Sequence, residues 1–199
     1  MKDEIARLKA ALALEGRESS DFDLNPMPEV RRGQLRPAAV LVPLWYHEDE
    51  ARLILTKRAS HLKHHPGQVA FPGGKQEAED TDSEACALRE TREEIGLPSG
   101  RVEILGRLPA HETVTGFSVV PVLGVIRYEF TPEPEAGEVD EVFWVPLSHV
   151  FDESRYRVER RIWRGASRGY YTVPYGPYYI WGATARILRG LADRVARCG

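Results

Sequence analysis

Hydrophobic residues recur along this chain with two spacings, one typical of helices and one typical of strands. Residues 2–14 place Ile5, Leu8 and several alanines on one side of a helix. Residues 38–46 and 51–57 are short apolar runs of the kind found in buried strands. The further predicted elements are strands over 101–109, 113–128 and 142–147, a hairpin over 156–163 and 169–173, and a helix from 180 to about 197. At 199 residues we expect one domain, with the first helix packed on its body or on a second subunit.

The stretch from residue 71 to residue 97 carries the strongest local signals. It contains Phe-Pro-Gly-Gly, then an acidic loop, then a segment with the features of a helix. Thr81 and Glu84 have the spacing of a capping box, and Gly96 followed by Pro98 suits the end of a helix. The acidic residues of the loop are Glu77, Glu79, Asp80 and Asp82.

Three carboxylates fall on one side of this predicted helix. At 100° per residue, Glu90, Glu93 and Glu94 lie within an arc of about 100°, nearly opposite the apolar positions. Like charges that close repel unless a cation lies between them, and hard oxygen ligands favour Mg²⁺ or Mn²⁺. The alternative is a solvated surface that Arg89 and Arg92 neutralise through helix-spaced pairs. The glycines and the acidic loop before the helix favour the metal site.

The same segment resembles the Nudix box, Gly-x5-Glu-x7-Arg-Glu-U-x-Glu-Glu-x-Gly-U, in which U is usually bulky and apolar. From Arg89 to Leu97 every position matches except Thr91, which occupies a U position. Upstream, Asp80 stands where the motif has Glu, and eight residues rather than seven separate it from Arg89. The extra residue leaves the carboxylates of the helix in place.

The longer loop is similar to that of one Nudix branch, the coenzyme A diphosphatases, whose loop has Gly-Gly-x-x-Asp-x-x-Asp spacing. This chain has Gly73-Gly74-x-x-Glu77-x-x-Asp80. Residues 55–63 and 67–74 resemble the extended motif of the same branch, with Ala59 and Lys63 in place of a Ser and an Arg. The pattern Ile-Trp-Gly-x-Thr-Ala-x-Ile-Leu over residues 180–188 is also similar to that branch.

This resemblance covers roughly residues 35–190 and implies the Nudix fold, an α/β (α+β) architecture. A mixed β-sheet would be sandwiched between helices, and the Nudix box would form a loop-helix-loop. Residues 1–34 would be an N-terminal helix and connector packed on the body, and residues 35–199 the Nudix domain with its C-terminal helix. The implied reaction is hydrolysis of a nucleoside diphosphate linked to another group. For coenzyme A, the products would be 3′,5′-ADP and 4′-phosphopantetheine.

Site roles follow from the box. Glu90 and Glu94 would be the principal ligands of Mg²⁺ or Mn²⁺, and Glu93 would be a further ligand or the catalytic base. Arg89 would orient Glu93 through an i, i+4 pair, with a secondary role in touching phosphate. The two glycines at 73 and 74 would allow the backbone turn that brings the loop over the ligand. Nudix enzymes often take a base or further ligand from a loop opposite the box. The candidates in this chain are Glu112, Glu138 and Glu141.

A basic cluster precedes the glycines. It consists of Lys57, Arg58, His61, Lys63, His64 and His65. Lys57 and Arg58 are suited to meet phosphate oxygens, and by resemblance this region would hold the nucleotide end of coenzyme A with its 3′-phosphate. A solvated loop is the alternative, and the histidines lack the spaced partner ligands of a zinc site.

Aromatic residues are dense near the C-terminus. The tyrosines are Tyr170, Tyr171, Tyr175, Tyr178 and Tyr179. They would stack on an adenine or cover a pantetheine arm, although core or dimer packing explains them equally well. Trp181 is expected in the core.

The composition of the chain excludes several classes of binding partner. A net charge of −3 argues against nucleic acid held by bulk electrostatics, so we expect a small-molecule substrate. No apolar run approaches the ~20 residues that span a bilayer, and the first residues lack the order of a secretory signal. The two cysteines form no disulfide framework. These features predict a cytoplasmic protein without membrane or nucleic-acid partners, either alone or as a homodimer.

Three other functions remain open. One is a Nudix pyrophosphatase that acts on ADP-ribose or a nucleotide sugar. Another is a non-catalytic Nudix module that senses a nucleotide; such modules usually lose a box carboxylate, and all three helix glutamates are present here. The third, an RNA decapping enzyme, is disfavoured because no broad basic surface is evident.

Overall fold

The computed structural model describes residues 2–25, 34–47, 50–63, 65–163 and 165–198. Its helices are α1 (Lys2–Ala13), α2 (Ser83–Ile95), α3 (Leu147–Val150) and α4 (Gly182–Ala196), with 3-10 turns at Ser99–Arg101 and Glu153–Arg155. Its strands are β1 (Ser19–Ser20), β2 (Arg36–His47), β3 (Glu50–Arg58), β4 (Val69–Ala70), β5 (Gly73–Lys75), β6 (Val102–Arg107), β7 (His111–Glu112), β8 (Phe117–Ile126), β9 (Val139–Pro146), β10 (Arg157–Trp163) and β11 (Ala166–Thr172).

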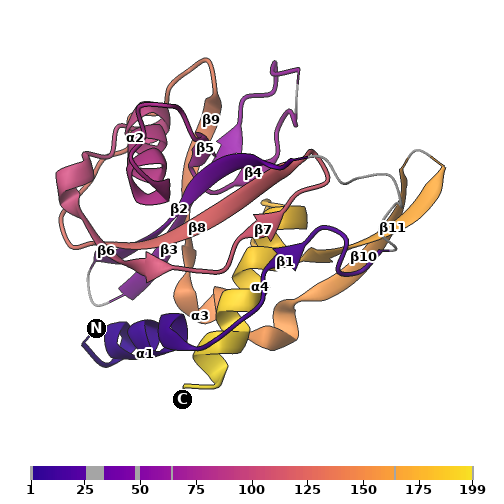
Figure 1. The fold of residues 1–199 in the computed structure, drawn as a ribbon. Helices are drawn as coiled ribbons and strands as arrows, with labels where there is room; N and C mark the ends of the chain where they lie inside the picture. Colours follow the sequence, from indigo (N-terminus) through magenta and orange to yellow (C-terminus); the bar gives the residue numbers. More distant parts are fainter. Residues whose placement is uncertain (1, 26–33, 48–49, 64, 164, 199) are drawn as a thin grey trace.

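One mixed sheet organises the domain (Figure 1). Within the described ranges it has nine strands in the order β1-β7-β8-β2-β3-β4, with β5 beside β2, β6 beside β8 and β9 beside β3. The central pair, β2 and β8, is parallel, whereas β2 with β3 and β3 with β9 are antiparallel. The remaining strands, β10 and β11, form a separate two-stranded ribbon.

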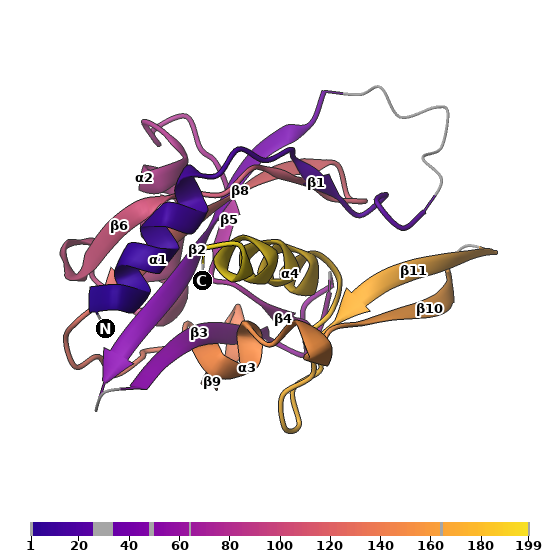
Figure 2. The same cartoon turned by 90° about the horizontal axis from the view of Figure 1, so that it is seen from below.

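Helices cover both faces of the sheet (Figures 1 and 2). Successive side chains of a strand point to opposite faces. On β2, Ala39 and Leu41 accordingly pack in the cluster that includes α2, while Val42 and Leu44 pack in the cluster that includes α1 and α4. Burial of both faces explains why β2 and β3 read as continuous apolar runs. The predicted fold class, a mixed sheet sandwiched between helices, is confirmed.

The start of α2 differs slightly from the prediction, whereas its end agrees with it. The helix is capped by Asp82, whose side chain accepts hydrogen bonds from the backbone N–H groups of Glu84 and Ala85, so the predicted capping box beginning at Thr81 is wrong. An aspartate directly before the helix satisfies two otherwise unpaired donors, and the helix starts one residue later as a result. The predicted stop is confirmed, because Gly96 has the left-handed φ of 73°.

The first helix lies on the body of the domain. Leu8 is fully buried, and the guanidinium of Arg194 in α4 donates to the carbonyls of Ala11 at 2.9 Å and Leu14 at 2.7 Å. These bonds cap the C-terminal carbonyls of α1, which lack partners within the helix. Residues 26–33 of the predicted connector lie outside the described residues.

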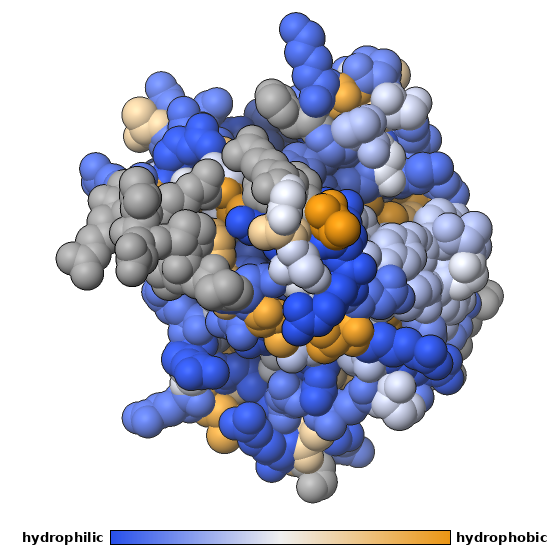
Figure 3. Space-filling model, turned by 90° about the vertical axis from the view of Figure 1, so that its right-hand side faces the viewer, coloured by the Kyte–Doolittle hydropathy of each residue, from blue (hydrophilic) through white to orange (hydrophobic). Residues whose placement is uncertain are grey.

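The β10–β11 ribbon extends away from the sheet (Figure 2). Val158 and Ile162 of β10 are 49% and 80% exposed. The face of the molecule on this side is mostly hydrophilic, with small separated hydrophobic areas (Figure 3). In the part of the chain that the structure describes, no helix is long and apolar enough to cross a bilayer.

Candidate active site

Two glycines form the floor of the site. Gly73 and Gly74 do not lie in an open loop: they belong to β5 and pair with Ala39 and Val40 of β2. A Cβ atom on Gly73, whose φ is 150°, would lie 2.4 Å from the carbonyl oxygen of Ala39 and 2.5 Å from Cα of Val40. A Cβ atom on Gly74 would lie 2.5 Å from a carboxylate oxygen of Glu90. Glycine is therefore required at 73 by the backbone of the neighbouring strand, whereas a side chain at 74 would displace the Glu90 carboxylate.

Glu94 lies deepest among the box carboxylates. Its residue surface is 5% exposed, and its carboxylate accepts a hydrogen bond from the backbone N–H of Gly73 at 3.3 Å. Burial raises the pKa of Glu94 to about 8, although the positive charge of Arg58 and the Gly73 hydrogen bond act in the opposite direction. The structure thus holds a desolvated carboxyl group directly against the glycine backbone.

Glu90 and Glu93 point in different directions from the same helix. The side chain of Glu90 is 16% exposed and lies against Gly74, and burial raises its pKa. The side chain of Glu93 is 60% exposed and lies 3.1 Å from Arg89. The structure therefore brings Glu90 and Glu94 to the glycines, while Glu93 lies at the outer edge with the arginine that was predicted to orient it.

Arg89 is held mainly by the acidic loop. Its Nε and Nη2 atoms donate to the two carboxylate oxygens of Asp80 at 2.9 Å and 2.8 Å, and Nη2 also donates to the carbonyl of Lys75. Its Nη1 atom lies 3.0 Å from Glu90. The Arg89 bond lowers the pKa of Asp80 to about 2. The loop carboxylate thus fixes the arginine, which in turn lies beside a box carboxylate.

We expect Asp80→Asn to reduce the free energy of unfolding at pH 7 by about 1–2 kcal/mol, because it removes a bidentate charge-assisted pair. A carboxyl group with a lowered pKa in the folded state stabilises the fold above its ordinary pKa, and the effect is lost as the pH falls through the folded value. The difference between wild type and variant should therefore shrink between about pH 4 and pH 2. Urea unfolding at several pH values measures this difference.

Glu79→Gln is the matched control, since Glu79 is an exposed acid of the same loop. It should leave the free energy of unfolding unchanged. An Asp80→Asn effect that is equal at neutral and acidic pH would contradict the ion-pair explanation.

The end of β3 separates the two basic residues that were predicted to act together. Lys57 pairs with Glu141 of β9, and Arg58 pairs with Val139 after a bulge that breaks the register between Lys57 and Arg58. The positive charge of Arg58 acts to lower the pKa of Glu94, whereas the negative charge of Glu138 acts to raise the pKa of both Glu90 and Glu94. Lys57 instead lines a hollow on another side of the strand.

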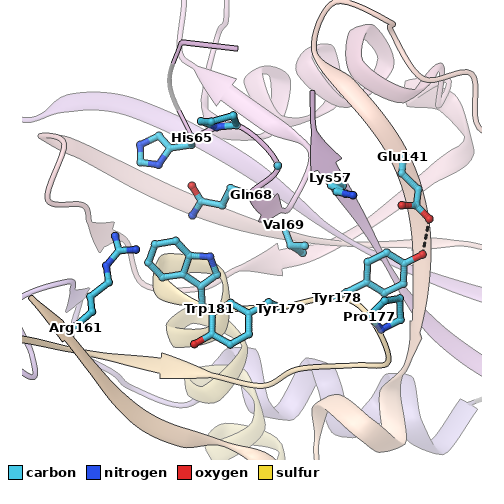
Figure 4. Close-up of a pocket in the computed structure, with 12 residues that line it drawn as sticks. Lys57, His65, Gln68, Val69, Glu141, Arg161, Pro177, Tyr178, Tyr179 and Trp181 are labelled. Carbon is cyan, nitrogen blue, oxygen red and sulfur yellow. Dashed lines mark hydrogen bonds between the residues drawn. The ribbon is translucent and has the colours of Figure 1, made fainter. Parts of the chain in front are cut away.

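This basic-aromatic hollow has a volume of about 520 Å³. Figure 4 shows Lys57 and Glu141 on one side of it and Arg161 beside the Trp181 ring on the other. Its lining residues are Lys57, His65, Pro66, Gly67, Gln68, Val69, Glu141, Arg161, Pro177, Tyr178, Tyr179 and Trp181. Lys57 and Glu141 of the hollow are one and three residues away in sequence from Arg58 and Glu138, the two residues whose charges affect the box carboxylates.

The three candidates for the catalytic base lie in three different parts of the structure. Glu138 lies near the box carboxylates, as its effect on their pKa values shows. Glu141 accepts a hydrogen bond from the Tyr178 hydroxyl inside the hollow. Glu112 of β7 is bonded to the Ser20 hydroxyl of β1 at 3.4 Å, away from these contacts. Within the basic cluster, His65 lines the hollow, and His64 lies outside the described residues.

Comparison with known proteins identifies the family. The model of the NUDIX domain matches residues 35–163. A protein named uncharacterized Nudix hydrolase NudL from Enterobacter sp. (strain 638) is 44% identical over 170 residues, which cover 84% of this chain and 88% of that protein. The protein of the same name from Salmonella dublin is 43% identical over 172 residues, covering 86% of this chain and 89% of that protein.

The chain belongs to the Nudix hydrolase family. It is therefore a hydrolase of phosphoric anhydrides that acts on small molecules, and enzymes of this family generally use divalent metal ions.

Two solved structures share the Nudix fold. The NUDIX domain of Shewanella oneidensis NrtR, solved in complex with ADP ribose, aligns with a TM-score of 0.51 at 18% identity, over 88% of this chain and 97% of that one. A MutT/nudix family protein from Enterococcus faecalis aligns with a TM-score of 0.52 at 19% identity, over 88% of this chain and 67% of that one. At 18% and 19% identity, these two structures show a likeness in fold alone.

The donor set of this Nudix site fits a hard divalent ion. Glu90 and Glu94 offer carboxylate oxygens, and Glu94 is buried with a single N–H donor against it among the described residues. In the described ranges, no group of three or more acidic, histidine or cysteine side chains is arranged to hold a metal ion. Mg²⁺ is typically held by one or two carboxylates, with substrate phosphates and water completing the shell. Two box carboxylates are therefore a suitable protein contribution.

Sequence reasoning missed one contact of the basic-aromatic hollow. Arg161 and Trp181 meet in the hollow, although Trp181 was assigned to the core and Arg161 to no role. Neither residue lies in a spaced motif with the box. Their meeting depends on how the ribbon packs on the start of α4, which residue spacing does not reveal.

Proposed function

We propose that this Nudix hydrolase cleaves the diphosphate of coenzyme A, giving 3′,5′-ADP and 4′-phosphopantetheine. The observation that carries the proposal is the pair of sites at the end of β3. Glu90 and Glu94 of α2 lie against the glycines, the charge of Arg58 at the end of β3 acts on Glu94, and the preceding residue, Lys57, lines the basic-aromatic hollow. A substrate with a diphosphate and a phosphorylated nucleoside would use the box carboxylates for the diphosphate and the basic-aromatic hollow for the nucleoside.

Glu90 and Glu94 would hold Mg²⁺ or Mn²⁺, with Glu93 or Glu138 as a further ligand or base. When bound, the ion supplies neutralisation of the diphosphate charge and lowers the pKa of the attacking water. Arg89, fixed by Asp80 and the Lys75 carbonyl, lies beside Glu90 and Glu93, and its role would be to hold these two carboxylates in position. Gly73 and Gly74 keep the space in front of these carboxylates free of side chains.

The coenzyme A assignment has support from the sequence and from the hollow. Residues 55–63 and 67–74 resemble the extended motif of the coenzyme A branch apart from Ala59 and Lys63, and four residues of these ranges line the hollow: Lys57, Gly67, Gln68 and Val69. The tyrosine and tryptophan rings offer flat surfaces for a purine. The cytoplasm would be the place of action, and a homodimer remains a prediction from the sequence.

Specificity constants test the proposal. With Mg²⁺, kcat/KM should be about tenfold or more higher for coenzyme A than for 3′-dephospho-coenzyme A or ADP-ribose, because a charged group is left without its partner when the phosphate is missing. Chelation of the metal should abolish turnover of all three. Preference for ADP-ribose would instead favour the ADP-ribose or nucleotide-sugar pyrophosphatase reading. Binding without turnover under Mg²⁺ and Mn²⁺ would favour a sensing module.

A further inference from the structure

Arg161 of β10 closes the hollow on the side away from Lys57 (Figure 4). Its guanidinium carbon lies 4.4 Å from the centre of the Trp181 ring and 5.8 Å from that of Tyr170. A guanidinium stacked on an aromatic face keeps the N–H groups at its edges available as donors. Arg161 thus presents oriented donors to the hollow without being buried itself.

The surroundings of Arg161 do not neutralise its charge. Glu159, two residues earlier on the same face of β10, accepts hydrogen bonds from the hydroxyls of Tyr179 at 2.6 Å and Thr172 at 3.5 Å. Arg161 makes no ion pair with the residues that the structure describes. Directly opposite it on β11 is Arg168, which is also a cation and therefore does not neutralise Arg161.

The hollow also holds a second cation at a suitable place. Lys57 lies across from Arg161, and the carboxylate next to it, Glu141, is bonded to the Tyr178 hydroxyl. The residue after Lys57 is Arg58, which acts on Glu94 in the box site. A ligand that extends from the box carboxylates into the hollow would therefore meet a separate group of positive charges.

We propose that Arg161 binds a phosphate of the substrate that is not cleaved. Under the proposed function this is the 3′-phosphate of coenzyme A, so the identity of the substrate rests on that proposal. The Trp181 ring acts as a positioning surface for the guanidinium. Arg161 is then a specificity-determining residue contributed by the ribbon, outside the Nudix box.

The chain offers a matched control in the next residue. Arg160 is an exposed arginine of the same strand, but adjacent residues of a strand point to opposite faces, and Arg160 does not line the hollow. Arg160→Ala and Arg161→Ala change the net charge equally, so any difference between them reports on the position and not on overall electrostatics. Arg161→Lys keeps the charge while losing the planar donors.

The kinetic experiment compares coenzyme A with 3′-dephospho-coenzyme A. Arg161→Ala should lower kcat/KM for coenzyme A by about tenfold or more, the usual effect of losing a charge-assisted hydrogen bond, and change the value for the dephospho form less than about twofold. The kcat/KM of Arg161→Lys for coenzyme A should lie between the values for wild type and Arg161→Ala. Arg160→Ala should match wild type on both substrates. An equal loss on both substrates for Arg161→Ala, or the same loss for Arg160→Ala, would overturn the assignment.

A binding measurement separates this inference from the proposed function. Calorimetric titration with 3′,5′-ADP and with 5′-AMP needs no turnover. Wild type should bind 3′,5′-ADP more tightly than 5′-AMP, and Arg161→Ala should lose that difference. If coenzyme A is not hydrolysed but this difference is present and depends on Arg161, the proposed function fails and the phosphate site stands. Equal affinity of wild type and Arg161→Ala for 3′,5′-ADP would refute the site, whatever the activity.

Discussion

Glu90→Gln is expected to lower the turnover of coenzyme A by about a thousandfold or more. Replacement of groups that merely support a metal ligand typically costs 10–100-fold, and loss of a direct carboxylate ligand should cost more. The glutamine keeps the size of the side chain that lies against Gly74, so the fold should remain intact. Turnover with saturating Mg²⁺ and the affinity for Mn²⁺, followed by electron paramagnetic resonance, should both fall in the variant.

Glu84→Gln provides the comparison on the same helix. Glu84 lies in the first turn of α2 and pairs with Arg107, away from the glycines. This variant should retain wild-type turnover and Mn²⁺ affinity. Normal activity in Glu90→Gln, or an equal loss in Glu84→Gln, would refute the assignment of the metal site to the box carboxylates.

Gly73→Ala should have the largest effect on stability. A methyl group there would lie 2.4 Å from the Ala39 carbonyl oxygen and 2.5 Å from Cα of Val40, and both are backbone atoms of the central strand β2. The φ of 150° is also rarely adopted by residues with a side chain. Strain and overpacking together should reduce the free energy of unfolding by about 3 kcal/mol or more. Urea unfolding measures this loss of free energy, and a variant that fails to fold would also agree with the prediction.

Gly67→Ala separates backbone strain from the steric clash. Gly67 has a positive φ of 68°, but a Cβ atom there would meet nothing within 4 Å. Its replacement should cost about 1 kcal/mol, the price of the left-handed conformation alone. Equal losses for the two variants would show that contact with β2 is not what requires glycine at 73.

Much of the box site follows from residue spacing. The 3.6-residue period placed Glu90 and Glu94 on a helix whose other side is buried, and Gly96 marked its end because few residues adopt a left-handed φ. The start of the helix was less predictable. Thr81 and Asp82 are both good capping residues, and the choice depends on which carboxylate or hydroxyl reaches the backbone donors.

The parts that depend on distant pairing could not be predicted from spacing. Lys57 and Arg58 are neighbours on β3 and serve different sites, and which of the two lines the hollow depends on how β3 pairs with β4 and β9. The glycines at 73 and 74 suggested a free turn, whereas they form a strand beside β2. Arg161 and Trp181 meet only because the ribbon packs beside the start of α4. Each of these contacts joins segments that are far apart in the chain or depends on strand register.

The central claim is that two carboxylates of α2, with a divalent ion, direct water to the diphosphate of coenzyme A. Mass spectrometric analysis of the products formed from coenzyme A and Mg²⁺ tests it most directly. Wild type should form 3′,5′-ADP and 4′-phosphopantetheine in equal amounts, and Glu90→Gln should form neither. Intact coenzyme A after incubation of the wild type with Mg²⁺ or Mn²⁺, or the same two products from the variant, would contradict it.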